Sequence, residues 1–428
     1  MYLDLKRSNL ALNGGQPVRT APWLDNFTTG DEEKDAVIRV LDSGYLSKFE
    51  GSHTPDPPFS FYGGPEVQGL EREWSEYYGC KHSISVNSAT SGLYAAIGAI
   101  GVGYGDEVIV SPYTMTACAM APLLFGAIPV FSDVEKETGC MDVKSIERAL
   151  SNRTKAILVV HQFGIPADMD KIMELAKQHD LKVIEDCAQA HGAKYNNKYV
   201  GTFGAIGVFS LNVNKSIQTG EGGICITDDE ELAYRLALIR NHGEAVVGPA
   251  KYANVVNIFG FNFRLTELQA AIAREQLKKI NKLNDHRLDL VETFSRGLDN
   301  HPFLHPLSGR LGCYSTYYVY PLRYESGIAR VEREEFVAAL NAEGAQFYQG
   351  YVEPLYLQPL YQQQSLFKHS YPFSAPENRG HTARYEKGTC SVAELLHQKT
   401  MIISEHIRFP HKKRDIEQLI QIVIKVTG

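Results

Sequence analysis

Short apolar runs alternate with longer amphipathic stretches between residues 65 and 240. The run Ala156–Val160 is wholly apolar, which is typical of a strand buried on both faces of a parallel sheet. Strands of this kind alternating with helical patterns predict βαβ units and an α/β fold. The expected strands are 82–86, 107–111, 128–131, 156–160, 182–185, 206–210 and 223–227, and the expected helices are 31–41, 65–78, 88–100, 116–125, 143–150, 169–179 and 229–240. The sequence therefore predicts a mostly parallel, seven-stranded sheet.

The C-terminal part opens with one long helical pattern, in which apolar residues recur at close to 3.6 residues. It predicts a helix over 265–284, and a second helix from about Asp285 is expected to lead into a smaller α+β domain. The elements expected in that domain are a strand near 317–322 and helices over 332–341 and 416–426. We therefore expect three parts: an irregular N-terminal arm over 1–30, a large coenzyme-binding domain over 31–284 and a small domain over 285–428.

Composition narrows the class of protein. The chain has 428 residues, 44% of them hydrophobic and 22% charged, which is ordinary for a soluble globular protein of two domains. A net charge of −7 without a long basic run argues against nucleic acid as a partner. No apolar run is long enough for a signal peptide or a membrane span. The seven cysteines are scattered without a C-x-x-C pair, so we expect no metal site and no disulfide framework, and a reducing cytoplasm is the simplest compartment.

A cluster of small polar residues lies where the first expected strand gives way to a helix. Residues 86–92 read Val-Asn-Ser-Ala-Thr-Ser-Gly. Small residues let a backbone approach an anion, and the free N–H groups of a first helical turn point at it with the helix dipole behind them. Thr90 and Ser91 would add hydroxyl donors. The plainer interpretation is an N-cap cluster, because Ser and Thr are common there.

The stretch 183–223 supplies an acid and a lysine. Asp186 follows an apolar strand and is expected at its C-terminal end, where ligands of open α/β sheets collect. A buried carboxylate there can keep the ring nitrogen of pyridoxal phosphate protonated, and Gln189 can hydrogen-bond the phenolic oxygen of the ring. A structural cap or a metal ligand are the alternatives for Asp186.

Lys215 lies in a turn beside Gly220–Gly223, where a backbone can press against a flat ligand, and would carry the coenzyme aldehyde as an imine. A solvent-exposed side chain is the alternative for Lys215.

Five blocks together resemble a known family. NSATSGL (87–93), GAIPVFSDVE (126–135), VIEDCAQAHGA (183–193), NVNKSIQTGEGG (212–223) and GFNFRLTELQAAIAREQL (260–277) occur in the order found in DegT/StrS-type sugar aminotransferases. These are pyridoxal-phosphate enzymes of the aspartate aminotransferase fold (fold type I), and the likeness runs from about Asn26 to the C-terminus. It implies a Schiff-base role for Lys215, a ring-nitrogen role for Asp186 and a contact to the phenolic oxygen for Gln189. It further implies phosphate contacts from Ala89, Thr90 and Ser210, and from Asn262 to the phosphate of a neighbouring subunit, hence a homodimer with shared sites.

The chain departs from the family pattern at two places. A Thr-aromatic pair usually covers the coenzyme ring, whereas this chain has Thr114-Met115. Met115 can still cover the ring, because its sulfur is polarizable, and Tyr113 is the alternative. Residues 48–61 read as an insertion, which is expected near the site mouth and is a candidate for substrate selection.

The expected activity is ping-pong transamination from Glu or Gln to a keto sugar, nucleotide-linked or not, or to a keto cyclitol. One rival is a sugar dehydratase, but those enzymes carry histidine at the position of Lys215. A second rival is a non-catalytic regulator that binds the coenzyme, and a nucleotide-binding enzyme would need a G-x-G-x-x-G motif after the first strand. His161 is expected to be a hydrogen bonder in the site wall rather than a catalyst. Residues 348–361 are expected in the core and at the rim of the small domain, with Tyr351 or Tyr356 as candidate substrate contacts.

Overall fold

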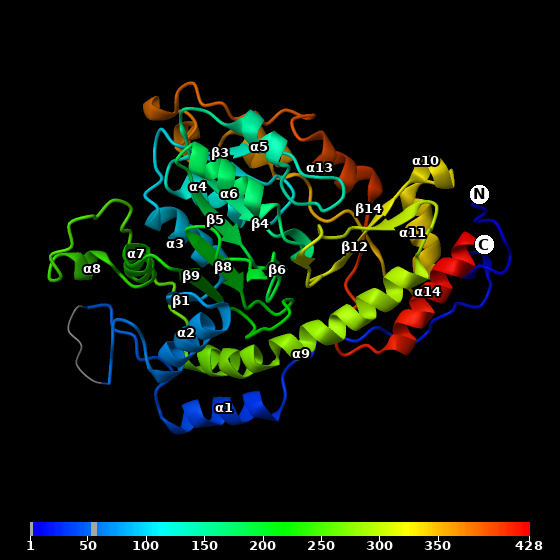
Figure 1. The fold of residues 1–428 in the computed structure, drawn as a ribbon, viewed down its shortest axis with the longest axis horizontal. Coiled ribbons are helices and arrows are strands. Elements are labelled where there is room, and N and C mark those ends of the chain that lie inside the picture. Colours follow the sequence, from blue (N-terminus) through cyan, green and yellow to red (C-terminus); the bar gives the residue numbers. More distant parts are fainter. Residues whose placement is uncertain (1–2, 53–57) are drawn as a thin grey trace.

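A computed structural model describes residues 3–52 and 58–428 of the chain (Figure 1). Its main sheet has seven strands in the order β1-β9-β8-β5-β4-β2-β3. Only β9 runs antiparallel to its neighbours, and the other pairings are parallel. The strands are β1 (His82–Val86), β2 (Glu107–Val110), β3 (Ile128–Phe131), β4 (Thr154–Val160), β5 (Lys182–Asp186), β8 (Ile206–Ser210) and β9 (Gly223–Thr227). The predicted α/β fold with a mostly parallel, seven-stranded sheet is confirmed.

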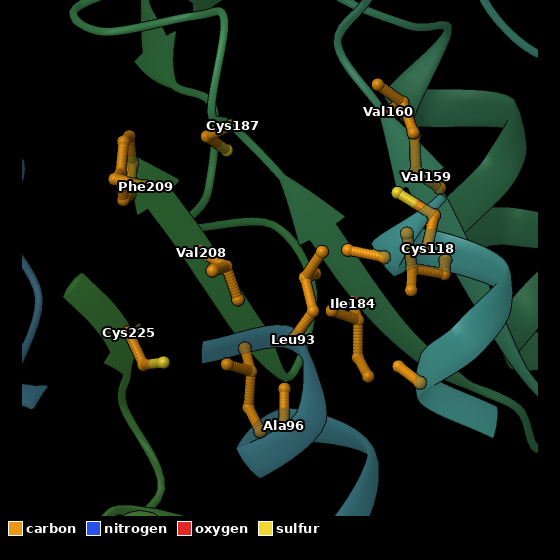
Figure 2. Close-up of a cluster of buried hydrophobic side chains, with 14 of the residues drawn as sticks. Leu93, Ala96, Cys118, Val159, Val160, Ile184, Cys187, Val208, Phe209 and Cys225 are labelled. Atoms are coloured by element: carbon orange, nitrogen blue, oxygen red, sulfur yellow. The ribbon is translucent and has the colours of Figure 1, made fainter. Parts of the chain in front are cut away.

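Helices pack on this sheet with small and apolar side chains, as Figure 2 shows for α3 and α4. Leu93 and Ala96 of α3 are buried against Ile184 and Val208 of the sheet. Each fully buried aliphatic side chain of this kind contributes about 1.5–3 kcal/mol. The helices of this region are α1 (Asp31–Asp42), α2 (Pro65–Tyr78), α3 (Ala89–Ala99), α4 (Ala117–Leu124), α5 (Val143–Ala149), α6 (Met169–Gln178), α7 (Glu230–Arg240) and α8 (Glu244–Val247).

One glycine sets how closely α3 approaches the sheet. A Cβ atom on Gly92 would lie 2.8 Å from Cγ1 of Val208 and 3.1 Å from Sγ of Cys225. Any larger residue would therefore push the helix outward. The close approach fixes the first turn of α3 directly above the ends of the neighbouring strands.

The long helix α9 (Glu267–Gly297) has 31 residues and begins with a capping box between Thr266 and Gln269. At 1.5 Å per residue it is roughly 46 Å long, and it passes from the large sheet to the C-terminal elements (Figure 1). The predicted break near Asp285 is wrong. No glycine or proline interrupts the helix before Gly297, and Asn284 donates its side-chain N–H to the carbonyl of His191 (2.9 Å) instead of ending the helix.

A second, antiparallel sheet lies at the other end of α9, with the order β10-β12-β14-β13. Its apolar core is separate from the core of the large sheet. The N-terminal arm packs here: Leu3 and Leu10 join this core, and Arg19 forms an ion pair with Asp415 (2.9 Å). The elements are β10 (Leu304–Pro306), β12 (Tyr320–Tyr324), β13 (Tyr348–Gln349), β14 (Met401–Ser404), α10 (Ser326–Ala329), α11 (Arg333–Ala342) and α14 (Lys413–Thr427). A small third sheet joins β6 (Lys194–Tyr195), β7 (Lys198–Tyr199) and β11 (Cys313–Tyr314).

The segment between β13 and β14, which carries α12 (Pro359–Gln363) and α13 (Ser391–Leu395), returns to the large sheet. Tyr385 donates its hydroxyl to the carbonyl of Pro129 (2.9 Å), and Asn378 donates to the carbonyl of Gly126 (2.8 Å). Tyr356 and Tyr361 belong to the core of the large sheet, so their expected place in the small-domain core is wrong. The domain boundary at 284/285 stays a prediction. Within residues 3–52 and 58–428, no helix has the length and apolar character that a bilayer crossing requires.

Candidate functional site

The candidate site lies at one edge of the large sheet, where β1, β5 and β8 end. The sheet register places Val86 and Ser210 on either side of Gly223, and Asp186 beside Val208 of the next strand. Because β1, β8 and β5 run in the same direction, their C-terminal ends meet at this edge. The predicted phosphate cradle, ring-nitrogen acid and Ser210 are thus brought together from residues far apart in the chain.

The first turn of α3 is the predicted phosphate cradle. Ser88 caps the helix by accepting the N–H of Ser91 on its hydroxyl (3.1 Å), and its carbonyl accepts the N–H of Gly92 (3.0 Å). Within the described part of the chain, the N–H groups of Ala89 and Thr90 have no acceptor. A Cβ atom on Gly223 would lie 2.6 Å from the amide nitrogen of Ala89, so glycine is required below the turn. Two orphaned donors at a positive helix end are suited to a phosphate.

Asp186 is buried at the end of β5. One carboxylate oxygen accepts the N–H of Ala188 (2.9 Å), and the other accepts the thiol of Cys118 (3.1 Å). Burial raises the pKa of Asp186, and these two hydrogen bonds and the nearby Lys215 oppose the rise. Among the described residues, the buried carboxylate forms no ion pair. A protonated ring nitrogen would supply the missing positive charge, so Asp186 fits the predicted role.

Gln189 has a fixed orientation. Its side-chain oxygen accepts the N–H of Phe163 (2.7 Å), and its side-chain nitrogen donates to the hydroxyl of Tyr351 (2.9 Å). Burial raises the pKa of Tyr351, so this hydroxyl stays protonated. Tyr351 therefore lies at the site, whereas Tyr356 is buried in the core and is hydrogen-bonded to Glu394.

Lys215 is carried on a tight loop. Its N–H donates to the carbonyl of Asn212 (2.9 Å), and its carbonyl accepts the side chain of Asn26 from the N-terminal arm (2.9 Å). The amine nitrogen lies 4.3 Å from the ring centre of Tyr318. No ion pair to this amine is formed among residues 3–52 and 58–428. The lysine thus rests on an aromatic face, free of an acid that would hold it away from an incoming carbonyl carbon.

His161 is a buried hydrogen bonder, as expected. Its Nδ1 accepts the N–H of Ala167 (3.1 Å), so the ring proton is on Nε2 and is donated to Glu185 (3.0 Å). The Glu185 carboxylate also accepts three backbone N–H groups. His161, Glu185 and Cys187 lie close enough together to hold a metal, but these four donors already occupy the carboxylate.

Three other predicted site residues, Tyr113, Met115 and Asn262, are either packed in the core or exposed. Tyr113 has no exposed surface and packs edge-on against Tyr351, so it has no face to offer a ligand, whereas Met115 is 54% exposed. Asn262 is exposed, and its side-chain oxygen accepts Nε of Arg264 (2.7 Å). Its predicted reach to a neighbouring subunit stays a prediction.

The insertion 48–61 falls partly outside the described residues, which omit 53–57. Its base is held by Asn241, whose side chain donates to the carbonyls of Glu50 (2.7 Å) and Phe61 (3.0 Å). Phe49 lines a cavity of about 400 Å³ together with Asn262. A role in substrate selection stays a prediction.

Several residues at the site have no sequence signal. Cys118 contacts Asp186, Asn26 contacts Lys215, and Tyr318 lies below the lysine amine. His191 lies within the motif block 183–193, which does not indicate its role. It is fully buried, neither ring nitrogen has a hydrogen-bond partner among residues 3–52 and 58–428, and burial and the nearby Lys215 lower its pKa to about 3.

The sheet order, a buried acid and a lysine without an ion pair among the described residues, all at one sheet edge, match the fold type I class of pyridoxal-phosphate enzymes. Residues 59–377 match the profile of the DegT/DnrJ/EryC1/StrS aminotransferase family. The chain belongs to this family, so it is a transaminase that depends on pyridoxal phosphate.

Individual relatives support the same family assignment. L-glutamine:2-deoxy-scyllo-inosose aminotransferase of Micromonospora echinospora is 34% identical over 365 residues, which cover 82% of this chain and 84% of that protein. The spore coat polysaccharide biosynthesis protein SpsC of Bacillus subtilis is 33% identical over 350 residues, covering 79% and 85% of the two chains. The solved aminotransferase from Psychrobacter cryohalolentis superposes with a TM-score of 0.78 at 30% identity, over 95% of this chain and 98% of that one.

Proposed function

We propose that this enzyme moves an amino group from L-glutamine or L-glutamate to the keto group of a sugar, nucleotide-linked or free, or of a cyclitol. The observation that carries the proposal is the unpaired amine of Lys215, held above Tyr318 at the edge that also holds Asp186 and the α3 turn. The relative from Micromonospora echinospora, whose name states a glutamine donor and a cyclitol ketone, supports this donor and acceptor class.

The residues present fit pyridoxal phosphate. The orphaned N–H groups of Ala89 and Thr90, with the hydroxyl of Ser210, would hold its phosphate, and Asp186 would hold its ring nitrogen. Gln189 would hydrogen-bond its phenolic oxygen and Met115 would cover its ring. When bound, the coenzyme supplies an aldehyde that takes up the amine and a ring that accepts the electron pair released at the substrate carbon.

The chain's own residues provide the proton transfers. Lys215 would be the base that removes the α-proton of the donor and later returns a proton to the acceptor carbon. Asp186 would hold a negative charge beside the ring nitrogen. Tyr318 keeps the lysine amine near the reacting carbon, because its ring face attracts the ammonium and offers no proton acceptor in competition.

We further propose that the working unit is a homodimer with shared sites. Asn262 is exposed beside Arg264 and Thr266 at the start of α9, where its side chain is available to the phosphate of a second subunit. A dehydratase of related fold would require histidine where this chain has Lys215, and a regulator that only binds the coenzyme would not exchange amine.

Replacing Lys215 with alanine tests the proposal. The variant is expected to lose turnover with every donor, and the wild-type absorbance of the lysine-bound coenzyme should be absent from it. Lys155→Ala is the control, because Lys155 is exposed on β4, which begins at the opposite edge of the sheet. L-glutamine and L-glutamate are then added separately to the wild type while the imine absorbance is followed, and keto sugars and cyclitols are screened as acceptors. Persisting turnover in Lys215→Ala, or no amine exchange in the wild type with any amino acid, would contradict the proposal.

A further inference from the structure

Positive charge gathers around Tyr318 without an ion-paired acid. Lys215 lies over its ring, and both Arg287 of α9 and Arg408, which follows β14, interact electrostatically with Tyr318. Among the described residues, neither arginine forms an ion pair, and the Nε atoms of both are buried without a hydrogen-bond acceptor. Buried charges are normally paired, because desolvation costs several kcal/mol per ion. The cluster is therefore suited to an anion that arrives from outside.

Arg287 forms the deep part of this cluster. It is fully buried and donates one N–H to the hydroxyl of Ser216 (2.6 Å), the residue after Lys215, and more weakly to the carbonyl of Thr316 (3.4 Å). Burial, and then the charge of Arg408, lower the pKa of Arg287 to about 9. Arg287 thus holds the lysine loop and adds a positive charge behind it.

Arg408 forms the accessible part. Its segment is fixed on α9 next to Arg287, because His286 hydrogen-bonds the carbonyl of His411 (2.8 Å) and Asp289 pairs with Lys413 (2.6 Å). The side chain is partly exposed, and its own hydrogen-bond donors have no acceptor in the described chain. Asp25 and Glu405 influence its pKa but form no ion pair with it.

We propose that Arg408 binds the α-carboxylate of the amino-acid donor, with Arg287 behind it holding the lysine loop and supplying the second positive charge. The inference rests on the proposed function. The donor amine must reach the carbon that Lys215 holds, and the carboxylate oxygens of an α-amino acid lie about 3 Å from its amine nitrogen. An anion site beside Lys215 is therefore where that carboxylate falls. A guanidinium binds it with two parallel hydrogen bonds. A free keto sugar or a cyclitol carries no anion, and the diphosphate of a nucleotide-linked sugar is separated from the keto carbon by the sugar ring.

The test uses the holoenzyme and its donor half-reaction. Arg408→Met is expected to raise the apparent Kd for L-glutamine and L-glutamate about 10- to 100-fold, the loss typical of a charged hydrogen-bonded pair. Arg408→Lys should lie between Arg408→Met and the wild type, because it keeps the charge and loses the fork. Arg414→Met is the matched control, since Arg414 is exposed at the start of α14 and forms no ion pair with any residue of the described chain. It should leave the Kd unchanged.

Binding without turnover gives a second readout. 2-Methylglutamate and 2-methylglutamine have no α-proton, so calorimetry measures their affinity alone. Their affinity should fall in Arg408→Met, whereas 4-aminobutanamide, which is glutamine without the α-carboxylate, should bind the wild type and Arg408→Met equally well. Arg287→Gln should weaken the methylated amino acids by a smaller factor and spare 4-aminobutanamide. An equal loss for both ligands in Arg287→Gln would overturn the charge role of Arg287.

The two proposals fail in different ways. If the wild type exchanges amine with no amino acid, the proposed transamination fails. If the wild type exchanges amine and Arg408→Met, with wild-type coenzyme absorbance and thermal unfolding, keeps its affinity for both donors and both methylated amino acids, the carboxylate site is overturned and the transamination stands.

Discussion

The proposed coenzyme side and the proposed donor side of this site are built in different ways. The coenzyme side uses the ends of β1, β5 and β8, and its residues follow buried strands of one sheet. The donor side joins Asn26 of the arm, Arg287 of α9, Tyr318 near β12 and Arg408 after β14. A sheet edge therefore fixes one set of groups by main-chain register, and the other set depends on how separate elements pack.

The difference has a physical consequence. Hydrogen bonds of the sheet ladder hold Asp186 and Ser210 regardless of their side chains. Tyr318 donates its main-chain N–H to the carbonyl of Phe163 (2.9 Å), whereas Arg287 and Arg408 lie outside the large sheet and are placed by side-chain contacts and by the packing of α9 and the arm. We expect substitutions on the coenzyme side to change chemistry with the fold intact, and substitutions on the donor side to change donor affinity and local order together.

Asp186→Asn is expected to slow the chemistry more than any substitution on the donor side. Asparagine keeps the size but cannot hold a positive ring nitrogen, so the rate of the donor half-reaction should fall about 10²- to 10⁴-fold, the range attributed to a positioned acid–base group. The fall is measured by stopped-flow absorbance of the bound coenzyme. Asp299→Asn is the control, because Asp299 is exposed beyond α9. A loss below tenfold, with coenzyme fully bound, would contradict the ring-nitrogen role.

Local sequence predicted where the residues of the proposed coenzyme side lie. Strand β5 is an apolar run that ends in Asp186, and the turn after β1 is a run of small residues, so the strands and their common edge could be predicted, whereas their role toward a coenzyme stays a prediction. Lys215 needed the motif blocks as well, because its loop has no periodicity.

The donor side could not be predicted in this way. An arginine in a sequence shows neither its burial nor its lack of an acid, and Arg287 and Arg408 are 121 residues apart (408 − 287). The continuity of α9 had a usable signal, namely the absence of glycine and proline before Gly297. The packing of Tyr356 and Tyr361 on the large sheet had none, because the Pro- and Gln-rich stretch around them lacks a period.

Acid is expected to lower the free energy of unfolding through two buried histidines, His191 and His406. Burial, and then the nearby Lys215, lower the pKa of His191 to about 3. Burial, and then His411, lower the pKa of His406 to about 3. Unfolded histidine titrates near 6.5, so between these values the unfolded chain binds more protons. The free energy of unfolding is therefore expected to fall as pH falls from about 6.5 to about 3, by up to about 1.4 kcal/mol per pH unit and histidine.

Denaturant unfolding at several pH values measures this slope. His191→Gln and His406→Gln should each flatten it by a similar amount, because both pKa values are lowered to about 3. His179→Gln is the control at an exposed position. The raised pKa of Asp186 acts in the opposite sense at the acid end, so the slopes of variants are compared with one another. Equal slopes in all three variants would contradict the assignment.

Tyr351→Phe removes the hydrogen bond that the side chain of Gln189 donates to the hydroxyl of Tyr351. Gln189 would keep its bond from Phe163 and lose the acceptor of its side-chain nitrogen, which costs about 1 kcal/mol. We expect about a fivefold weaker coenzyme affinity and a shift in the absorbance maximum of the bound coenzyme, because Gln189 is the proposed partner of its phenolic oxygen. Tyr104→Phe, at an exposed tyrosine, is the control. An unchanged spectrum would separate Tyr351 from the coenzyme side.

Asn26→Ala tests the contact by which the arm reaches the lysine loop. The side chain of Asn26 donates to the carbonyl of Lys215 (2.9 Å), and Thr28 next to it bonds Gln276 of α9 (2.8 Å), so the arm stays attached when Asn26 is shortened. One partly exposed hydrogen bond contributes about 0.5–1 kcal/mol, so the donor half-reaction should slow only about two- to fivefold. Amide hydrogen exchange of residues 212–220 should speed up by a similar factor, because the loop loses an anchor outside its own sheet. Thr20→Ala, at an exposed position of the same arm, should change neither. If the rate falls and exchange in the loop does not change, the arm acts on the donor directly, and the division between a sheet-held coenzyme side and a packing-held donor side would have to be redrawn at Lys215.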